Sequence, residues 1–151
     1  MKLKDFDFRI WSVKKEKYLD ELYSNIISLS SDKSIKWYNR NYKILAIEFS
    51  PYDSIPLMND NEECFEIELF TGLCDKNGTK IYEGDILYYF KDCSEGEVFK
   101  YQVLFKEGAF YLFESYDGFV YDEDLIAEFD LKELQVMGNI HENKELLNVR
   151  L

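Results

Sequence analysis

The chain has little proline, little histidine and no long apolar segment. Two prolines and one histidine occur in 151 residues. So little proline argues against a disordered, low-complexity chain. One histidine and three cysteines without Cys-x-x-Cys spacing do not make a convincing zinc site, and we expect neither a metal nor a cofactor. No apolar run approaches the roughly 18 residues of a membrane-spanning helix, and the charged first residues are unlike a signal peptide. The sequence therefore predicts a cytoplasmic protein without membrane contact, whose three thiols are reduced and partly buried.

Basic residues are also scarce, and they are unevenly distributed. The chain carries 18 Lys and Arg against 30 Asp and Glu, a formal net charge of −12. Residues 1–50 hold 10 basic and 7 acidic residues, whereas residues 51–151 hold 8 and 23. The acidic residues are densest between Glu114 and Glu133. A surface of one sign attracts partners of the opposite sign, here basic ones, and repels nucleic acid.

Aromatic residues are abundant, and many alternate with polar ones. Tyr and Phe occur 12 times each, and 46% of the residues are hydrophobic, which is ample for a packed interior. Residues 65–69 alternate between apolar residues and Glu66 and Glu68, which predicts a strand whose glutamates face solvent. The same alternation in residues 99–105 and 110–113, on either side of Glu107-Gly108, predicts a hairpin.

The stretch from Phe70 to Leu87 contains two turn signals. Asn77-Gly78 predicts a tight turn, because both residues tolerate positive φ. Asp75 is placed to accept hydrogen bonds from the backbone amides of that turn. Gly84 predicts a second bend before an apolar strand.

Both prolines, Pro51 and Pro56, fall in the segment 51–63. Proline and the neighbouring Asn and Asp residues favour irregular backbone, and the net charge changes sign in the same region. We therefore predict a linker at 51–63 between a β-rich N-terminal subdomain, 1–50, and a C-terminal subdomain, 64–151, with the whole chain forming one compact unit.

The C-terminal subdomain is expected to hold about four or five short strands, which close most simply into a barrel that leaves no exposed edge. The predicted fold class is mainly β. It comprises a small closed barrel of the Src-homology type in the C-terminal part, the smaller β-rich N-terminal subdomain, and short helical turns, one of them at 142–147.

Three ordered motifs resemble the signature of the YopX-like family, which occurs mainly in bacteriophages and prophages. The motifs are Phe8-Arg9-Ile10-Trp11, the run from Thr71-Gly72-Leu73 through Asp75-Lys76-Asn77-Gly78 to Ile81-Tyr82-Glu83-Gly84-Asp85-Ile86, and Val136-Met137-Gly138-Asn139-Ile140-His141-Glu142-Asn143-Lys144-Glu145-Leu146-Leu147. The chain departs from the family pattern at Ile10, His141 and Lys144, where the family has Ala, Tyr and Pro. The resemblance implies a phage or prophage protein in the cytoplasm of a bacterial host. It supplies no established activity and no catalytic residues, and it implies that His141 packs rather than transfers protons.

The first functional hypothesis is a non-catalytic protein-binding module. Its acidic C-terminal surface, with Asp122, Glu123 and Asp124, would bind a basic host protein. The alternative explanation is that these residues form a solvated face that only keeps the protein soluble.

Two further hypotheses are a nucleic-acid-binding barrel and a carboxylate-based hydrolase. Small barrels bind nucleic acid through basic and exposed aromatic side chains, and the candidates here are Lys36, Trp37, Tyr38 and Arg40. The acidic net charge argues against this hypothesis. A hydrolase would use paired carboxylates, but the sequence shows no nucleophile motif and no phosphate-binding loop. An unpaired edge strand would also allow a homo-oligomer.

Overall fold

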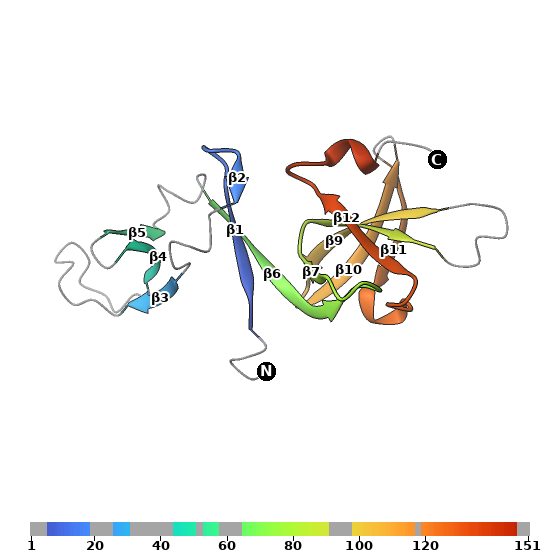
Figure 1. Cartoon of the computed structure of the whole chain (residues 1–151), viewed down its shortest axis with the longest axis horizontal. Coiled ribbons are helices and arrows are strands. Elements are labelled where there is room, and N and C mark those ends of the chain that lie inside the picture. Colours follow the sequence, from blue (N-terminus) through green and yellow to red (C-terminus); the bar gives the residue numbers. More distant parts are fainter. Residues whose placement is uncertain are drawn as a thin grey trace. The chain divides into compact units, whose positions relative to one another are not determined.

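The computed structural model describes residues 6–18, 26–30, 44–50, 53–57, 65–90, 98–116 and 119–147. These residues form 12 strands, β1 to β12, and two short 3₁₀ helices, η3 and η4 (Figure 1). The predicted mainly β fold class is confirmed. The chain divides into two compact units, Arg9–Ile67 and Met1–Phe8 with Glu68–Leu151, and each is described by itself.

The unit Arg9–Ile67 contains a hairpin and a small sheet. Strands β1 (Phe8–Ser12) and β2 (Lys17–Tyr18) are antiparallel, and Trp11 packs edge-on against Tyr18 with 5.0 Å between the ring centroids. The charged residues between them form a turn, in which Glu16 has a φ of 50°. Strands β3 (Ile26–Ser30), β4 (Ile44–Ser50) and β5 (Asp53–Leu57) form an antiparallel sheet in that order.

Strand β5 lies inside the range 51–63 that we expected to be a linker. Pro56 is compatible with this strand, because β5 is the outer strand of its sheet and proline, which lacks an N–H group, is tolerated on edge strands. The compact unit that contains β5 continues to Ile67.

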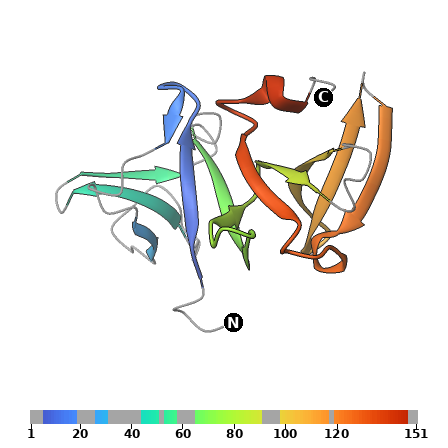
Figure 2. The same ribbon diagram turned by 45° about the vertical axis from the view of Figure 1, so that its right-hand side comes forward.

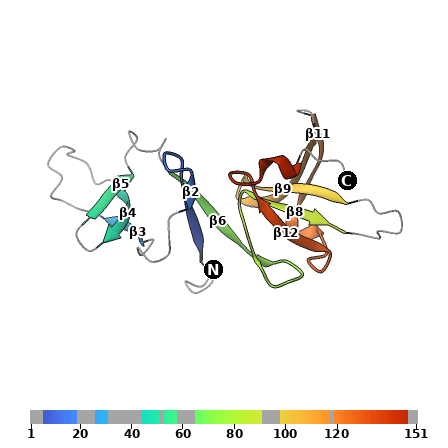
Figure 3. The ribbon, with the colours of Figure 1, turned by 45° about the horizontal axis from the view of Figure 1, so that its top comes forward.

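The second unit contains most of β6 (Phe65–Cys74), then β7 (Lys80–Tyr82), β8 (Asp85–Tyr89), β9 (Phe99–Lys106), β10 (Ala109–Tyr116), β11 (Phe119–Leu125) and β12 (Leu134–Asn139). Strands β6 and β7 pair with each other, and β8 to β12 form one curled antiparallel sheet. The order in the five-stranded sheet is β11-β10-β9-β8-β12, and the strands curve into a half-barrel (Figures 2 and 3). Strands β11 and β12 are at the two ends of this order, so ladder hydrogen bonds among the described strands do not close the barrel that we expected.

Alternate residues of this sheet form the hydrophobic core. Successive side chains of a strand point to opposite faces. The inward set, together with residues of β7 and η3 (Ile126–Glu128), is fully or almost fully buried and consists of Ile81, Leu87, Tyr101, Val103, Leu112, Ile126 and Leu134. The predicted hairpin of β9 and β10 is confirmed. Its two turn residues, Glu107 and Gly108, have φ angles of 53° and 83°, as a tight turn that matches the strand twist requires.

The turn after β6 is held by the carboxylate of Asp75, as the sequence indicated. Its Oδ1 accepts hydrogen bonds from the amides of Asn77, at 2.8 Å, and Thr79, at 2.9 Å. Its Oδ2 accepts a third bond, at 2.9 Å, from the amide of Val136 in β12. Burial raises the pKa of the Asp75 carboxyl, but the three amide bonds and a side-chain hydrogen bond with Thr79 together outweigh burial and hold that pKa below its usual value.

Three smaller expectations also have outcomes in this unit. The expected helical turn near the end of the chain is confirmed as η4 (Lys144–Leu147). Cys74 is exposed, so the expected partial burial is wrong for this thiol, while Cys64 and Cys93 lie outside the described residues. Within the described part of the chain, no helix is both long and apolar enough to cross a membrane.

Candidate functional site

The acidic residues singled out from the sequence lie on β11, at one end of the half-barrel sheet. Strands β10 and β11 run side by side (Figure 2). In their register Glu114 is opposite Asp122, and Leu112 is opposite Asp124. Directly opposed residues share a face of the sheet, as do residues two apart in one strand. Glu114, Asp122 and Asp124 therefore gather on one face, and we call these three residues the acidic cluster.

Glu123 does not belong to this cluster. It alternates with Asp122 and Asp124 along β11, so its side chain leaves the opposite face. There its Oε1 forms an ion pair of 2.6 Å with Nζ of Lys106. The sequence grouped three consecutive acids, but the strand separates the middle one from its neighbours. The sequence prediction also missed Glu114, which only the register with β10 brings close to Asp122.

Like charges and burial shift the acid–base equilibria of the acidic cluster. The negative charge of Asp122 is the main cause that raises the pKa of Asp124. Burial, and then the charge of Asp122, raise the pKa of Glu114. The hydroxyl of Tyr101 donates a long hydrogen bond of 3.4 Å to Oδ2 of Asp122, and burial followed by the Asp122 charge raises the Tyr101 pKa far above its usual value. The hydrogen bond from Tyr101 therefore does not fully offset the repulsion between the carboxylates of the acidic cluster.

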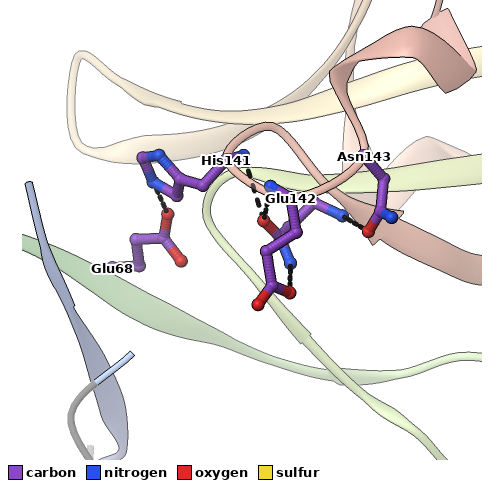
Figure 4. A network of polar contacts seen from close by, with 5 residues as sticks. Glu68, His141, Glu142 and Asn143 are labelled. Atoms are coloured by element: carbon purple, nitrogen blue, oxygen red, sulfur yellow. Dashed lines mark hydrogen bonds and ion pairs between the residues drawn. The ribbon is translucent and has the colours of Figure 1, made fainter. Parts of the chain in front are cut away.

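A second polar group surrounds the end of β12 (Figure 4). Nε2 of His141 lies 2.8 Å from Oε1 of Glu68, and the two side chains are 12% and 5% exposed. The expectation that Glu68 faces solvent is wrong, because His141 provides a polar partner for its carboxylate inside the fold. The His141 side chain is mostly buried, and it makes a polar contact with Glu68 in addition to packing.

The turn that carries His141 is organised by Asn139. Its Oδ1 accepts hydrogen bonds from the amides of His141 and Glu142, both at 3.0 Å. Its Nδ2 donates to Oε2 of Glu142 at 2.9 Å (Figure 4). A short amide side chain that bonds to the following backbone in this way stabilises a turn. This network explains the Gly-Asn-Ile-His-Glu-Asn segment as a structural element that fixes the chain after β12.

The side chain of Glu68 also packs closely against the backbone at Gly84. The φ of Gly84 is +79°, and a Cβ built on it would lie 2.5 Å from Oε1 of Glu68. We expect Gly84→Ala to lower the free energy of unfolding by about 2 to 3 kcal/mol, since it adds a steric contact to the cost of left-handed backbone. Gly78→Ala is the matched control, because Gly78 has a φ of +82° with nothing within 4 Å of its Cβ position. Denaturant unfolding of both variants measures the difference, and equal losses would remove the Glu68 contact as the cause.

The other candidate sites from the sequence are not supported by the part of the chain that the structure describes. Lys36, Trp37, Tyr38 and Arg40, the alternative nucleic-acid-binding residues, lie outside them. Within the described ranges, no group of three or more His, Cys, Asp or Glu side chains is arranged to hold a metal ion.

Comparisons with known proteins extend over nearly the whole chain. The family model described as YopX protein matches residues 7–148. The crystal structure of protein EF1440 from Enterococcus faecalis has 28% sequence identity and a TM-score of 0.54, over 95% of this chain and 98% of that one. The X-ray structure of protein yopX from Bacillus subtilis has 17% identity and a TM-score of 0.57, over 95% and 97% of the two chains, and is similar in fold. No curated protein matches the chain significantly.

Proposed function

Because the chain belongs to the YopX protein family, whose model covers residues 7–148, we propose that it is an accessory protein of a bacteriophage or prophage. In this proposal it is a non-catalytic protein-binding module that works in the bacterial cytoplasm. The acidic cluster of Glu114, Asp122 and Asp124 binds a basic protein of the host. The observation that carries the proposal is the strand register that gathers Glu114, Asp122 and Asp124 on one face at the end of the sheet order. The repulsion between these carboxylates agrees with it, since the charge of Asp122 raises the pKa of Asp124.

The physical argument rests on the relief of this repulsion. A cation placed beside two like-charged carboxylates stabilises their ionised forms and lowers their pKa values. Asp122 and Asp124 are two residues apart in one strand, so their Cα atoms are separated by about 6 to 7 Å. A partner that presents two Lys or Arg side chains at a similar spacing matches this separation. Asp124 is exposed, and β11 is the last strand in the sheet order, so a partner approaches without displacing another described strand.

Capture of partners from nuclease-treated bacterial lysate tests this function. We expect the wild-type chain to retain a basic protein, and we expect Asp122→Asn/Asp124→Asn to bind the purified partner about tenfold or more weakly, because two charges leave the interface. The matched control is Asp130→Asn/Glu145→Gln, which removes the same charge from two exposed positions away from the acidic cluster. Equal weakening by the two double variants would show that only net charge matters and would contradict a specific site.

The pH dependence of the same binding gives a second readout. A basic partner binds the carboxylates and not the protonated acids. Since the pKa values of Asp124 and Glu114 are raised, Asp124 becomes protonated at a higher pH than an ordinary aspartate, and Glu114 at a higher pH than an ordinary glutamate. Affinity is therefore expected to begin to fall at a higher pH than it would for an unperturbed aspartate and glutamate pair.

The capture experiment also has an outcome that would overturn the proposal. Recovery of only nuclease-sensitive complexes would favour nucleic-acid binding instead.

A further inference from the structure

Lys100 is enclosed on the face of the sheet opposite to the core. It alternates with the core residue Tyr101 in β9 and is 9% exposed. Its Nζ atom is buried and has no hydrogen-bond acceptor among the described residues. The ring of Tyr88 lies beside it, with its centroid 5.3 Å from Nζ. Burial lowers the pKa of the Lys100 amine. An ammonium group in this position loses hydration that a single aromatic ring replaces only in part.

The register places other donor-bearing side chains beside Lys100. Tyr88 of β8 is opposite Lys100 of β9 and opposite Gln135 of β12. The three residues therefore form a row across neighbouring strands on one face of the sheet; these strands lie side by side in Figure 3. The row supplies an ammonium, a phenol and an amide, each of which donates hydrogen bonds.

A second lysine adjoins this row through Phe90. The rings of Tyr88 and Phe90 are 6.4 Å apart, and Nζ of Lys76 lies 3.9 Å from the centroid of the Phe90 ring. Two cationic side chains thus flank a pair of aromatic rings in a protein whose net charge is −12. Lys76 is exposed and Gln135 is half-buried, so the group reaches the protein surface.

We propose that Lys100, Tyr88 and Gln135 form a binding site for a small carboxylate, with Lys76 and Phe90 at its rim. The carboxylate supplies the acceptor that Lys100 Nζ lacks, and the phenol and amide donate further hydrogen bonds to its oxygens. Charge-assisted hydrogen bonds of this kind are about twice as strong as neutral ones. The flexible four-carbon stem of Lys100 turns its amine toward the entering anion. A single enclosed ammonium matches a monovalent anion, while a polyanion such as nucleic acid is repelled by the acidic remainder of the chain.

Nuclear magnetic resonance of the full chain with ¹³C-labelled lysine tests the site. Acetate replaces chloride at constant ionic strength, and phosphate is titrated in parallel. We expect saturable shifts of the Lys100 and Lys76 side-chain signals with acetate and no saturable shift of the exposed Lys132. Equal, linear shifts of all lysines would overturn the proposal, and so would a saturable response to phosphate without one to acetate.

Variants separate this site from the acidic cluster. Lys100→Met is expected to weaken acetate binding about tenfold or more, as read from Lys76 and the β8 amides, since it removes a charge-assisted bond. Lys132→Met is the matched control and keeps wild-type binding. The cluster variant Asp122→Asn/Asp124→Asn also keeps it, because the acidic cluster lies on the other face of the sheet. Saturable acetate binding that persists in Lys100→Met would overturn the proposal, whatever the outcome for the basic partner.

Discussion

Asp75→Ala is expected to lower the free energy of unfolding of the Glu68–Leu151 part by about 3 to 5 kcal/mol. The substitution leaves three backbone amides, those of Asn77, Thr79 and Val136, without their acceptor. An unsatisfied buried donor costs about 1 to 3 kcal/mol; Asn77 and Thr79 are exposed residues, so their amides contribute the lower part of this range. The bond to Val136 also joins the turn after β6 to β12, so its loss weakens tertiary structure as well as the turn.

Amide hydrogen exchange of β8 and β9 measures this effect, because both strands belong to the same compact unit as Asp75. The matched control is Asp130→Ala. Asp130 is an exposed aspartate whose Oδ1 accepts one local bond, from the amide of Lys132 at 3.0 Å, and we expect its loss to cost about 1 kcal/mol or less. Similar losses in the two variants would contradict the role assigned to Asp75.

The Asp75 contribution also has a defined pH dependence. Its folded-state pKa is lower than the usual aspartate value, which is about 3.9 in unfolded chains. The carboxylate therefore stabilises the fold fully above that pH, and the contribution is lost as the pH falls through the folded-state pKa. The stability difference between wild type and Asp75→Ala should be constant near neutrality and shrink below about pH 4. A constant difference throughout this range would show that the ionised form is not what the amides require.

Lys100→Met is expected to act in the opposite direction and raise the free energy of unfolding by about 1 to 3 kcal/mol. Methionine keeps the length and the apolar stem of the side chain but removes an ammonium that has no acceptor among the residues that the structure describes. Replacing a buried charge by an apolar group of similar shape is often stabilising by about this amount. The gain should be largest near neutral pH. It should decrease as the pH rises above the lowered folded-state pKa of Lys100 toward the unfolded value, because the wild-type chain then no longer has to bury a charge.

The same hydrogen-exchange measurement on Lys100→Met and Lys132→Met checks this result. Lys132 is exposed, and its replacement is expected to change stability by about 0.5 kcal/mol or less. A destabilised Lys100→Met variant would mean that the ammonium and the Tyr88 ring contribute more in the folded chain than burial of the charge costs. If Lys100→Met is more stable than the wild type and no longer binds acetate, then the wild-type chain keeps Lys100 for binding at a cost in stability.

Local sequence patterns predicted the elements whose hydrogen bonds connect near neighbours. The turn at Asn77-Gly78 was predictable because Asp75 bonds to amides two and four residues later. The β9–β10 hairpin was predictable because alternation on both sides of Glu107-Gly108 fixes the strands and the turn together. The three motifs predicted the family, since they span almost the whole chain.

Residues that meet across the sheet were not predictable in the same way. Glu68 reads as a solvent-facing residue of an alternating strand, yet it is enclosed because His141, 73 residues later, lies against it. Asp122, Glu123 and Asp124 read as one acidic group, yet the strand places Glu123 on the other face with Lys106. Glu114 joins the two remaining aspartates only through the register of β10 with β11.

The sequence by itself determined the mainly β class, the local turns, the family and the acidic character of the C-terminal part. These follow from composition, from period-two alternation and from residues close together in the chain, for which no knowledge of long-range pairing is needed. The tertiary structure decided that the sheet is a half-barrel, which carboxylates share a face, and that the amine of Lys100 is buried beside Tyr88. Strand register and sheet order set these features, and a shift of one residue would move every side chain of a strand to the other face.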